Sequence, residues 1–372
     1  MIISALKSND TSDHRSPIHI DTISALIELD SEILFEEGIG EGIYTSDKEF
    51  LDKGLKVASR DECISSSDLV ITNQPLNENE VSSMKSNSTI LGIVNPFANQ
   101  ELINLCATKK INLVSMEFIP RITRAQKMDV LSSQANLAGY AAVIESAKYL
   151  STALPMMMTA AGTLKPARVF VIGVGVAGLQ AIATAKRLGA RVEAFDTRDV
   201  VEEQVNSLGA KFVKIDLGET GETDQGYAKE LTQEQIQKQK DLQSQVCARS
   251  DIVITTAQLF GRPAPQLIDK NTIDKMKPGS VIFDMAVESG GNVEGSKVDE
   301  VVEINGVKII GISNLASRVA NHASLALYNN FNHWICDFFD AETKNINFDF
   351  EDEIINSSVI VHAGKIINER FQ

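Results

Sequence analysis

The sequence is poor in cysteine, tryptophan and positive charge. Its 372 residues include four cysteines and one tryptophan, and 35 lysines and arginines stand against 50 aspartates and glutamates. The formal net charge of −15 argues against nucleic acid as a main partner, because binding to phosphates needs a basic surface. The charge does not exclude a membrane-bound partner with a basic face. The length is sufficient for two or three domains with a sizeable core.

The few cysteines form no pattern of a known kind of site. Cys63, Cys106, Cys247 and Cys336 are scattered and make no C-x-x-C pair. We therefore expect no bound metal. Buried, reduced thiols in a cytosol-like compartment are predicted instead.

Long apolar runs are also missing. The longest uncharged run near the middle of the chain covers the sixteen residues 149–164 and contains Pro155 and Gly162. It is shorter than the roughly 20 apolar residues that a membrane-spanning helix needs. The first residues, MIISALKSND, lack a basic region followed by a long apolar stretch, so no secretory signal is expected.

The chain does contain a regular alternation of strand-type and helix-type runs. Such alternation predicts an α/β fold with doubly wound sheets. Helix-type spacing of apolar residues occurs in 21–30 and 99–110. The buried strand-type runs are 1–6, 31–37, 67–74, 88–94 and 111–118, followed by 167–174, 190–196, 210–216, 250–257, 279–286 and 307–313.

Two long helices are predicted to join two lobes with a cleft between them. Residues 1–126 and 335–372 would form the first α/β lobe, and residues 154–314 the second. The connecting helix is expected over 127–153 and the returning helix over 315–334. Both follow from apolar residues that recur near one helical stripe.

The most specific motif is a glycine fingerprint, RVFVIGVGVAGLQ. Gly173, Gly175 and Gly178 form G-x-G-x-x-G directly after an apolar strand and open a helix, and Asp196 ends the next strand. In this order the first glycine makes a tight turn, the second lets a pyrophosphate approach the backbone, and the third packs helix on strand. The helix N-terminus attracts the phosphates. The motif predicts a dinucleotide site.

The nucleotide preference depends on two neighbouring charges. Asp196 would accept hydrogen bonds from the adenosine ribose and repel a 2′-phosphate, which favours NAD(H). Arg198 lies close by and argues for NADP(H). We give the carboxylate at the end of the strand the greater weight.

The stretch RITRAQKMDVLSSQ, residues 121–134, is unusually polar for a helix start. Arg121 and Asp129 could form an ion pair at the beginning of the helix, which would be a structural role. A binding role is the alternative, and the residues by themselves leave both open.

Four stretches together resemble one family. They are RITRAQKMDVLSSQANLAGY, PMMMTAAGTLKPARVFVIGVGVAGLQAIATAKRLGA, QGYAKE and KPGSVIFDMAVESGGN. Over about residues 115–325 the chain resembles proton-translocating nicotinamide nucleotide transhydrogenase, in its NAD(H)-binding component. The resemblance implies a Rossmann NAD-binding lobe beside a flavodoxin- or Rossmann-like lobe. It also implies direct hydride transfer from NADH to NADP⁺, coupled to proton movement across a membrane.

The resemblance assigns roles to individual residues. Arg121, Gln126, Asp129 and Ser132 would surround the nicotinamide, with Gln126 reaching toward the partner's nucleotide. Hydride transfer of this kind needs proximity and orientation rather than an acid or base. Further NAD(H) contacts would come from the rest of the cleft, where Gly226 allows a mobile loop to bend and Tyr227 covers the cofactor. They are Lys127, Met128, Val176, Thr197, Arg198 and Gln258, beside the glycine fingerprint and Asp196.

The resemblance also implies partners. NADP(H) would be bound only by a separate beta subunit, and a transmembrane alpha-2 type subunit would complete the complex. This chain would be the separate alpha-1 type subunit, paired with a second copy of itself. It would lie on the cytoplasmic face of the inner membrane.

Two other functions are weighed against this one. Alanine dehydrogenase shares the architecture, but Asn73 stands near its lysine position, Glu288 replaces its aspartate, and no histidine occurs between residues 20 and 321. A keto acid would therefore lack its proton-transfer group. A non-catalytic NAD-binding module is the second alternative, and the glycine fingerprint fits it equally well.

Overall fold

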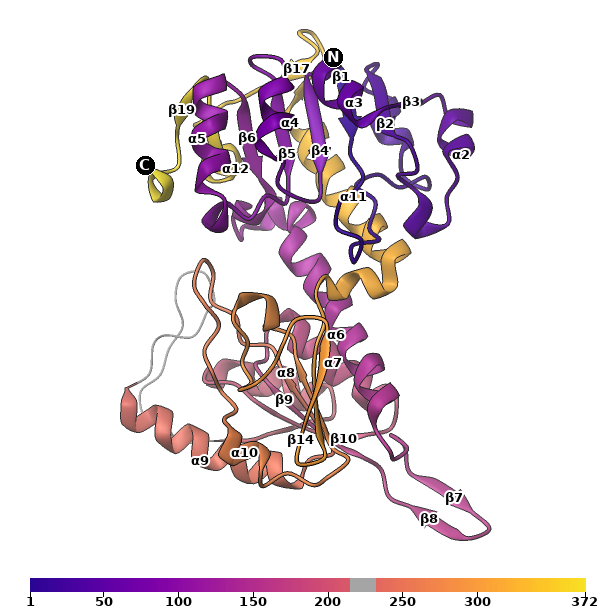
Figure 1. Cartoon of the computed structure of the whole chain (residues 1–372), viewed down its shortest axis with the longest axis vertical. Coiled ribbons are helices and arrows are strands. Elements are labelled where there is room, and N and C mark those ends of the chain that lie inside the picture. The colour runs from indigo at the N-terminus through magenta and orange to yellow at the C-terminus, as the bar shows by residue number, and fades with distance from the viewer. Residues whose placement is uncertain (215–231) are drawn as a thin grey trace. The chain divides into compact units, whose positions relative to one another are not determined.

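The computed structural model describes residues 1–214 and 232–372, so the predicted contacts Gly226 and Tyr227 lie outside the described residues. The chain divides into two compact units (Figure 1). Unit 1 combines both ends of the chain, Met1–Gln134 and Val319–Gln372, and unit 2 is the continuous segment Ala135–Arg318. Each unit is built on one large sheet, which confirms the predicted α/β class.

Unit 1 contains an eight-stranded sheet in the order β19-β18-β6-β5-β4-β1-β2-β3. The first six strands in sequence are parallel, and β18 joins β6 in the antiparallel direction. Runs such as LVIT are buried along their whole length, as parallel strands covered on both faces require. The strands are β1 (Ile2–Ala5), β2 (Glu32–Glu36), β3 (Lys56–Ala58), β4 (Leu69–Thr72), β5 (Thr89–Gly92), β6 (Asn112–Ser115), β18 (Val359–His362) and β19 (Lys365–Ile366).

Helices, most of them short, lie between these strands in the sequence. The helix predicted over 21–30 is only the single turn α1 (Ser24–Ile27), because no capping side chain starts it and Asp30 turns into the left-handed region. Capping boxes begin α2 and α4, where Ser46 pairs with Glu49 and Asn77 with Glu80. The remaining helices are α2 (Asp47–Asp52), α3 (Arg60–Ser66), α4 (Glu78–Ser83), α5 (Gln100–Lys109), α11 (Ala320–Phe338) and α12 (Glu353–Ser358).

The core of unit 1 draws on both ends of the chain. Trp334 and Tyr328 of α11 are fully buried in the same cluster as Ile3 and Ile71 of the sheet. A small two-stranded sheet, β16 (Phe339–Asp340) with β17 (Asn345–Ile346), follows α11. The chain order of the strands reverses between β1 and β4, which makes this the switch point of the sheet.

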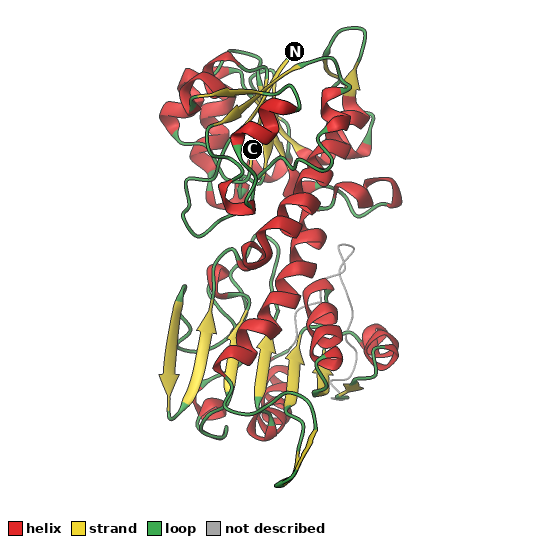
Figure 2. Ribbon diagram, turned by 90° about the vertical axis from the view of Figure 1, so that its right-hand side faces the viewer, coloured by secondary structure: helices red, strands yellow, loops and turns green. Residues whose placement is uncertain are grey.

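Unit 2 contains a seven-stranded sheet in the order β11-β10-β9-β12-β13-β15-β14 (Figure 2). Its switch point lies between β9 and β12, and only β14 runs antiparallel. The strands are β9 (Arg168–Ile172), β10 (Arg191–Phe195), β11 (Lys211–Phe212), β12 (Ile252–Thr255), β13 (Val281–Asp284), β14 (Glu300–Ile304) and β15 (Val307–Gly311). The helices are α7 (Val176–Arg187), α8 (Glu202–Ser207), α9 (Gln233–Arg249) and α10 (Lys270–Ile273).

The edge strand β14 has no counterpart among the expected strand-type runs. All five of its residues are exposed or half-buried, so its sequence lacks the apolar run that marks the central strands. A separate hairpin of β7 (Met157–Thr159) and β8 (Gly162–Leu164) occupies the second half of the long uncharged run.

The two long helices begin later than their sequence patterns suggested. α6 covers Val130–Tyr149, and residues Thr123–Met128 before it form a 3₁₀ helix, η4. The start is displaced because Asp129 takes an extended backbone conformation and caps α6. A second 3₁₀ segment, η7 (Leu315–Val319), precedes α11.

Candidate nucleotide-binding site

The glycine fingerprint forms the turn between β9 and α7. Gly173 has a φ of +96°, a left-handed conformation that L side chains rarely adopt. Its amide donates to the Phe195 carbonyl of β10 at 2.9 Å. Gly175 precedes the first residue of α7, and a Cβ built there would meet no atom within 4 Å. The turn therefore leaves open space above the N-terminus of a twelve-residue helix, which suits an approaching phosphate.

The third glycine holds the helix against the strand. A Cβ on Gly178 would lie 2.0 Å from the Gly173 carbonyl oxygen, so no larger residue fits without movement of the backbone. The same carbonyl accepts a hydrogen bond from Thr256 Oγ1 at 3.0 Å. Gly139 of α6 has an equivalent role, since its Cβ would lie 2.2 Å from the Ala177 carbonyl oxygen. The motif had not indicated Thr256 or Gly139, because both lie far from it in the sequence.

Asp196 and Arg198 form a largely buried pair at the end of β10. Arg198 Nε donates to Asp196 Oδ1 at 2.9 Å, and Nη2 donates to Oδ2 at 2.9 Å. The Arg198 amide also donates to Oδ1, and the Val174 amide donates to Oδ2 at 2.7 Å. Each oxygen thus receives two donors, which fills the four acceptor positions of a carboxylate. The two charges that pointed to different nucleotides neutralise each other.

Gln258 follows β12 on the other side of the switch point. Its exposed side chain donates from Nε2 to the Met285 carbonyl at 3.2 Å. The loop around it is held by Asn292, whose Nδ2 donates to the carbonyls of Ala257 and Pro265 at 2.8 Å. The backbone amide of Asn292 in turn donates a hydrogen bond to the fully buried carboxylate of Asp284. Asp284 and Asn292 are therefore positioning residues within the DMAVESGGN stretch that no sequence motif singled out.

The carboxyl ends of three strands thus converge in unit 2. Gly173, Gly175, Gly178 and Val176 follow β9, while Asp196, Thr197 and Arg198 follow β10. Gln258 follows β12. In open α/β sheets this edge at the switch point is where ligands bind.

The polar stretch in unit 1 is organised around Asp129. Its Oδ1 accepts from the Ser132 amide at 2.9 Å, and its Oδ2 accepts from the Ser132 hydroxyl at 2.6 Å. Asp129 is thus the N-cap of α6, a position where aspartate satisfies an amide that the helix leaves without a partner. The capping role does not need Arg121, whose side chain is exposed.

The residues between Arg121 and Asp129 differ in how far their side chains are exposed to solvent. Met128 is completely buried in the core of unit 1, so only its main chain can face a ligand. Lys127 is exposed and its ammonium pairs with Asp337 Oδ1 of α11 at 2.7 Å. Gln126 is exposed as well, and its amide group has no hydrogen-bond partner among residues 1–214 and 232–372. The Gln126 amide is accordingly available to a ligand or a partner protein.

The positions compared with alanine dehydrogenase are engaged in internal contacts. Asn73 Nδ2 donates to the Arg15 carbonyl at 3.0 Å. Glu288 accepts from the Asn314 amide at 3.3 Å. The buried His19 accepts from the Asp21 amide through Nδ1 at 3.3 Å, and burial is the main cause that lowers the pKa of its ring.

No group of three or more metal-ligating side chains occurs in the part of the chain that the structure describes. Within those same residues, no helix has the length and apolar character needed to span a membrane.

Comparisons with known proteins agree with this geometry. Residues 6–138 match the family model "Alanine dehydrogenase/PNT, N-terminal domain", and residues 142–369 match "Alanine dehydrogenase/PNT, C-terminal domain". The first part of the NAD(P) transhydrogenase alpha subunit of Rickettsia prowazekii is 41% identical, over 99% of this chain and 96% of its own length.

Solved structures extend the comparison. The crystal structure of transhydrogenase from Sinorhizobium meliloti has a TM-score of 0.88 and 40% identity, covering 99% of this chain and 100% of that one. An L-alanine dehydrogenase has a TM-score of 0.81 at 20% identity, covering 100% of this chain and 98% of that one, which shows a shared fold alone. The chain belongs to the alanine dehydrogenase/PNT family, and within it to the NAD(P) transhydrogenase alpha subunits.

Proposed function

We propose that this chain is the NAD(H)-binding subunit of a proton-translocating transhydrogenase. NADH bound here would give a hydride directly to NADP⁺ held by a partner subunit, and a membrane subunit would couple the transfer to proton movement. The observation that carries the proposal is the presence of both an open dinucleotide turn at Gly175 and the exposed, unpartnered amide of Gln126 among the described residues. The first binds a nucleotide, and the second is available to orient a nicotinamide.

The chemistry agrees with the groups present. Direct hydride transfer requires two nicotinamide rings held close and in the right orientation, and no proton moves to or from the protein. Gln126, Asp129, Ser132 and Arg121 supply amide, carboxylate, hydroxyl and guanidinium groups. Asp129 and Ser132 are fixed by their mutual hydrogen bonds, so they can present a defined edge to a ligand. We place these four residues at the nicotinamide.

The cofactor contacts follow from unit 2. The glycine turn and Val176 would hold the pyrophosphate, and the Asp196–Arg198 pair with Thr197 would contact the adenosine ribose. Gln258 would line the same site. We propose NAD(H) as the ligand, with NADP(H) bound only on the partner.

The proposed partners are an NADP(H)-binding beta subunit and a transmembrane alpha-2 type subunit. The name of the Rickettsia relative describes it as one part of an alpha subunit, which supports a divided complex. We also propose a homodimer, docked on the cytoplasmic face of the membrane complex. We propose that the β7–β8 hairpin binds the second copy. Apolar side chains are exposed on or beside this two-stranded sheet: Met156 is 61% exposed, Met158 81% and Leu164 49%.

The test is reconstitution with a separately prepared NADP(H)-binding subunit. NADH and thio-NADP⁺ are added, and the reduced thionicotinamide is followed by its absorbance. Transfer should require both proteins. NADH binding without transfer would instead indicate a non-catalytic module, and oxidation of L-alanine by the chain alone would indicate an amino-acid dehydrogenase.

The dehydrogenase alternative has less support from the contacts. Asn73 cannot supply the cation of a lysine, and its amide is committed to the Arg15 carbonyl. The histidines lie outside residues 20–321, and His19 is buried and already accepts a backbone hydrogen bond. Proton transfer to an amino acid would therefore lack a poised base.

A further inference from the structure

Unit 1 has a cavity at the edge of its sheet where the parallel strands begin. The cavity has a volume of about 350 Å³, at the lower end of the range for small-molecule sites. Asp68, Thr89 and Asn112, at the starts of β4, β5 and β6, line it together with residues of β17 and the segment after it (Figure 1). The carboxyl ends of the strands lie roughly 13 Å away, one strand length of four residues. The proposed function places no group at this edge.

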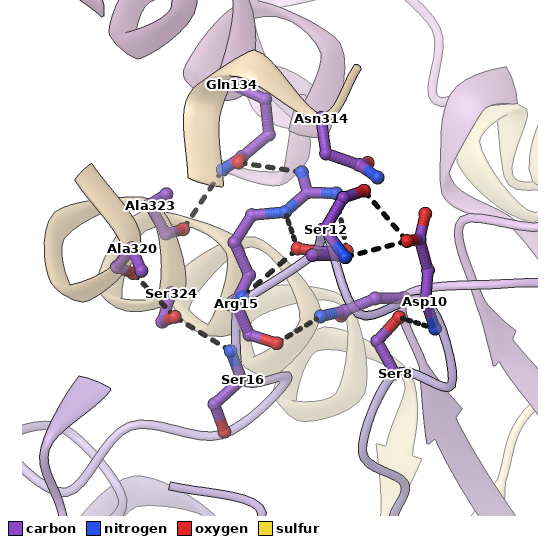
Figure 3. Close-up of polar contacts among 12 residues, drawn as sticks. Ser8, Asp10, Ser12, Arg15, Ser16, Gln134, Asn314, Ala320, Ala323 and Ser324 are labelled. Atoms are coloured by element: carbon purple, nitrogen blue, oxygen red, sulfur yellow. Dashed lines mark hydrogen bonds and ion pairs between the residues drawn. The ribbon is translucent and has the colours of Figure 1, made fainter. Parts of the chain in front are cut away.

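Polar side chains at the two edges of the sheet differ in their bonding. Beyond the carboxyl ends they bind one another: Arg15 Nη1 donates to Gln134 Oε1 at 3.1 Å, and Ser324 Oγ accepts from the Ser16 amide at 2.8 Å (Figure 3). In the cavity, the exposed side chains of Ser86 and Asn87 make no hydrogen bond within residues 1–214 and 232–372. These hydroxyl and amide groups are available to a ligand.

The main chain of Asn87 is held firmly beneath its free side chain. Its amide donates to the Lys110 carbonyl at 2.8 Å, and its carbonyl accepts from Asn112 Nδ2 at 3.3 Å. Asn112 is buried, and its Oδ1 accepts from the Ala363 amide at 3.1 Å. Asn87 has a φ of +66°, a left-handed conformation that asparagine adopts more readily than most residues. The free amide is therefore carried on a fixed turn.

The charges in the cavity balance each other. Lys85 Nζ lies 3.3 Å from Asp68 Oδ1, and both side chains are partly exposed. The other oxygen, Oδ2, accepts from the Ile2 amide at 2.7 Å. The lining has one acidic and one basic side chain, so a phosphate or a carboxylic acid meets no surplus of positive charge. A neutral ligand is favoured.

One wall of the cavity is apolar. Ile346 and Phe348 line it and pack against the core of unit 1. The ring of Phe348 also lies against the ring of His362, with 4.7 Å between the centroids. A ligand for this cavity thus needs an apolar face on one side. On the other side it needs groups that both donate and accept hydrogen bonds, as hydroxyls do.

We propose that this cavity binds a neutral polyhydroxylated small molecule, a polyol or a monosaccharide. The hydroxyls of such a ligand bond to Ser86, Asn87 and Asp68, and its C–H face lies against Phe348. The site is formed entirely by unit 1 and does not depend on the proposed hydride transfer.

The probes are myo-inositol and D-ribose, titrated against the purified chain and followed by saturation-transfer difference NMR. NADH is present at saturation throughout, so that the nucleotide site does not contribute. A saturable signal is expected for at least one probe, with a dissociation constant on the order of 1 mM, because a few neutral hydrogen bonds each add only modest affinity. Melting temperatures are unsuitable, since polyols stabilise proteins by exclusion from their surface without binding.

Two variants at exposed positions locate the binding. Ser86→Trp places a large ring in the cavity and should weaken binding at least tenfold. Asn87→Gly keeps the left-handed turn and removes the amide, so a loss of about fivefold is expected. Ser82→Trp is the matched control, because Ser82 is exposed on α4 but does not line the cavity, and it should leave the affinity unchanged.

The absence of a saturable signal for both probes would overturn the proposal. An affinity that Ser86→Trp leaves unchanged, or that Ser82→Trp lowers equally, would place the binding elsewhere and overturn it as well. Glycine and sodium phosphate are titrated in parallel. If either binds more tightly than both polyols, the cavity is a site for a zwitterion or an anion, and the proposal is wrong.

Discussion

Arg198 and Asp196 share a two-bond ion pair that uses every acceptor position of the carboxylate once the two backbone amides are included. A ribose hydroxyl can donate to Asp196 only if one of these bonds is released. The side chain of Arg198 is the donor that can move away, since the other two donors are main-chain amides. We therefore expect the pair to set the nucleotide preference as a unit, rather than Asp196 alone.

Arg198→Ala should increase the preference for NADH over NADPH, by on the order of tenfold, or about 1.4 kcal/mol. The substitution opens the carboxylate to the ribose and removes the cation that a 2′-phosphate would contact. Titration of nucleotide fluorescence with NADH and NADPH measures both dissociation constants. Arg198→Lys retains the charge without the two-bond geometry. Its preference for NADH over NADPH should therefore lie between those of the wild type and Arg198→Ala. A preference that moves toward NADPH in Arg198→Ala would refute the assignment.

Gly175→Ala and Gly178→Ala should have different consequences. A Cβ at Gly175 meets nothing, and its φ of −85° suits alanine, so stability should change by less than about 1 kcal/mol. NADH affinity should nevertheless fall at least tenfold, or about 1.4 kcal/mol, because the methyl group occupies the path of the pyrophosphate. Gly178→Ala should cost about 2–3 kcal/mol of stability through its contact with the Gly173 carbonyl. Chemical denaturation and NADH titration distinguish the two. Full NADH affinity in Gly175→Ala would place the phosphates elsewhere.

Asp129→Asn should slow hydride transfer far more than it weakens NADH binding. Asparagine is as good an N-cap as aspartate, so the start of α6 and the stability should be preserved. Asp129→Ala is the contrasting variant and should also cost about 1 kcal/mol of stability through loss of the cap. Gln126→Asn should likewise reduce transfer more than binding. Single-turnover transfer rates and NADH dissociation constants are the measurements, and equal losses in both would assign these residues to binding only.

Stability should decline as the pH falls below about 6.5, in part through His19. Burial lowers the pKa of His19, while Asp21 and a hydrogen bond with Asn321 raise it and His322 lowers it further. Because the folded pKa lies below the unfolded value, the unfolded state takes up the proton first, and stability is lost as the pH falls from about 6.5 toward the folded pKa. His19→Gln should therefore show a shallower loss of melting temperature than the wild type does as the pH is lowered from neutral into the acid range. Parallel curves would mean that His19 does not contribute to the slope.

Met158→Glu should convert the proposed homodimer into a monomer without changing the stability of unit 2. Met158 is 81% exposed, so the charge costs little in a single copy but is costly in an apolar contact between two copies. Light scattering after size exclusion gives the mass. Val298→Glu, at a 47% exposed position outside the hairpin, is the control that should keep the dimer. Dimers in both variants would exclude the hairpin as the contact.

The sequence predicts the fold class because apolar strand runs and the glycine turn are local signals. β9, β12 and β13 contain continuous apolar runs, and every residue of these three strands except Arg168 is buried. Local signals did not reveal β14, which is an exposed edge strand, and they overestimated the helix around 21–30, which has no cap. Helix ends depend on a single side chain such as Asp129, and apolar spacing does not detect it.

The sequence predicts the part of the candidate site that a motif describes, because the motif requires particular residue types at fixed positions. The fingerprint glycines, Asp196 and Arg198 do meet at one sheet edge. The ion pair between Asp196 and Arg198 was not predicted. The sequence shows that two opposite charges are close, but it does not show that they bind each other or which of them can contact a ligand. Thr256 and Asn292 were missed because they act on the site through contacts that span 83 and 35 residues of sequence.

The division of unit 1 between the two ends of the chain has a consequence for synthesis. Unit 2 is one continuous segment, so all of its strands have left the ribosome before the last residues of the chain are made. Unit 1 lacks α11 and β18 until then, and with them the buried side chains of Trp334 and Tyr328. Since domains fold as units during synthesis, the nucleotide-binding unit is expected to fold first. The segment Met1–Gln134 would keep an exposed apolar face until the segment Val319–Gln372 is made and covers it.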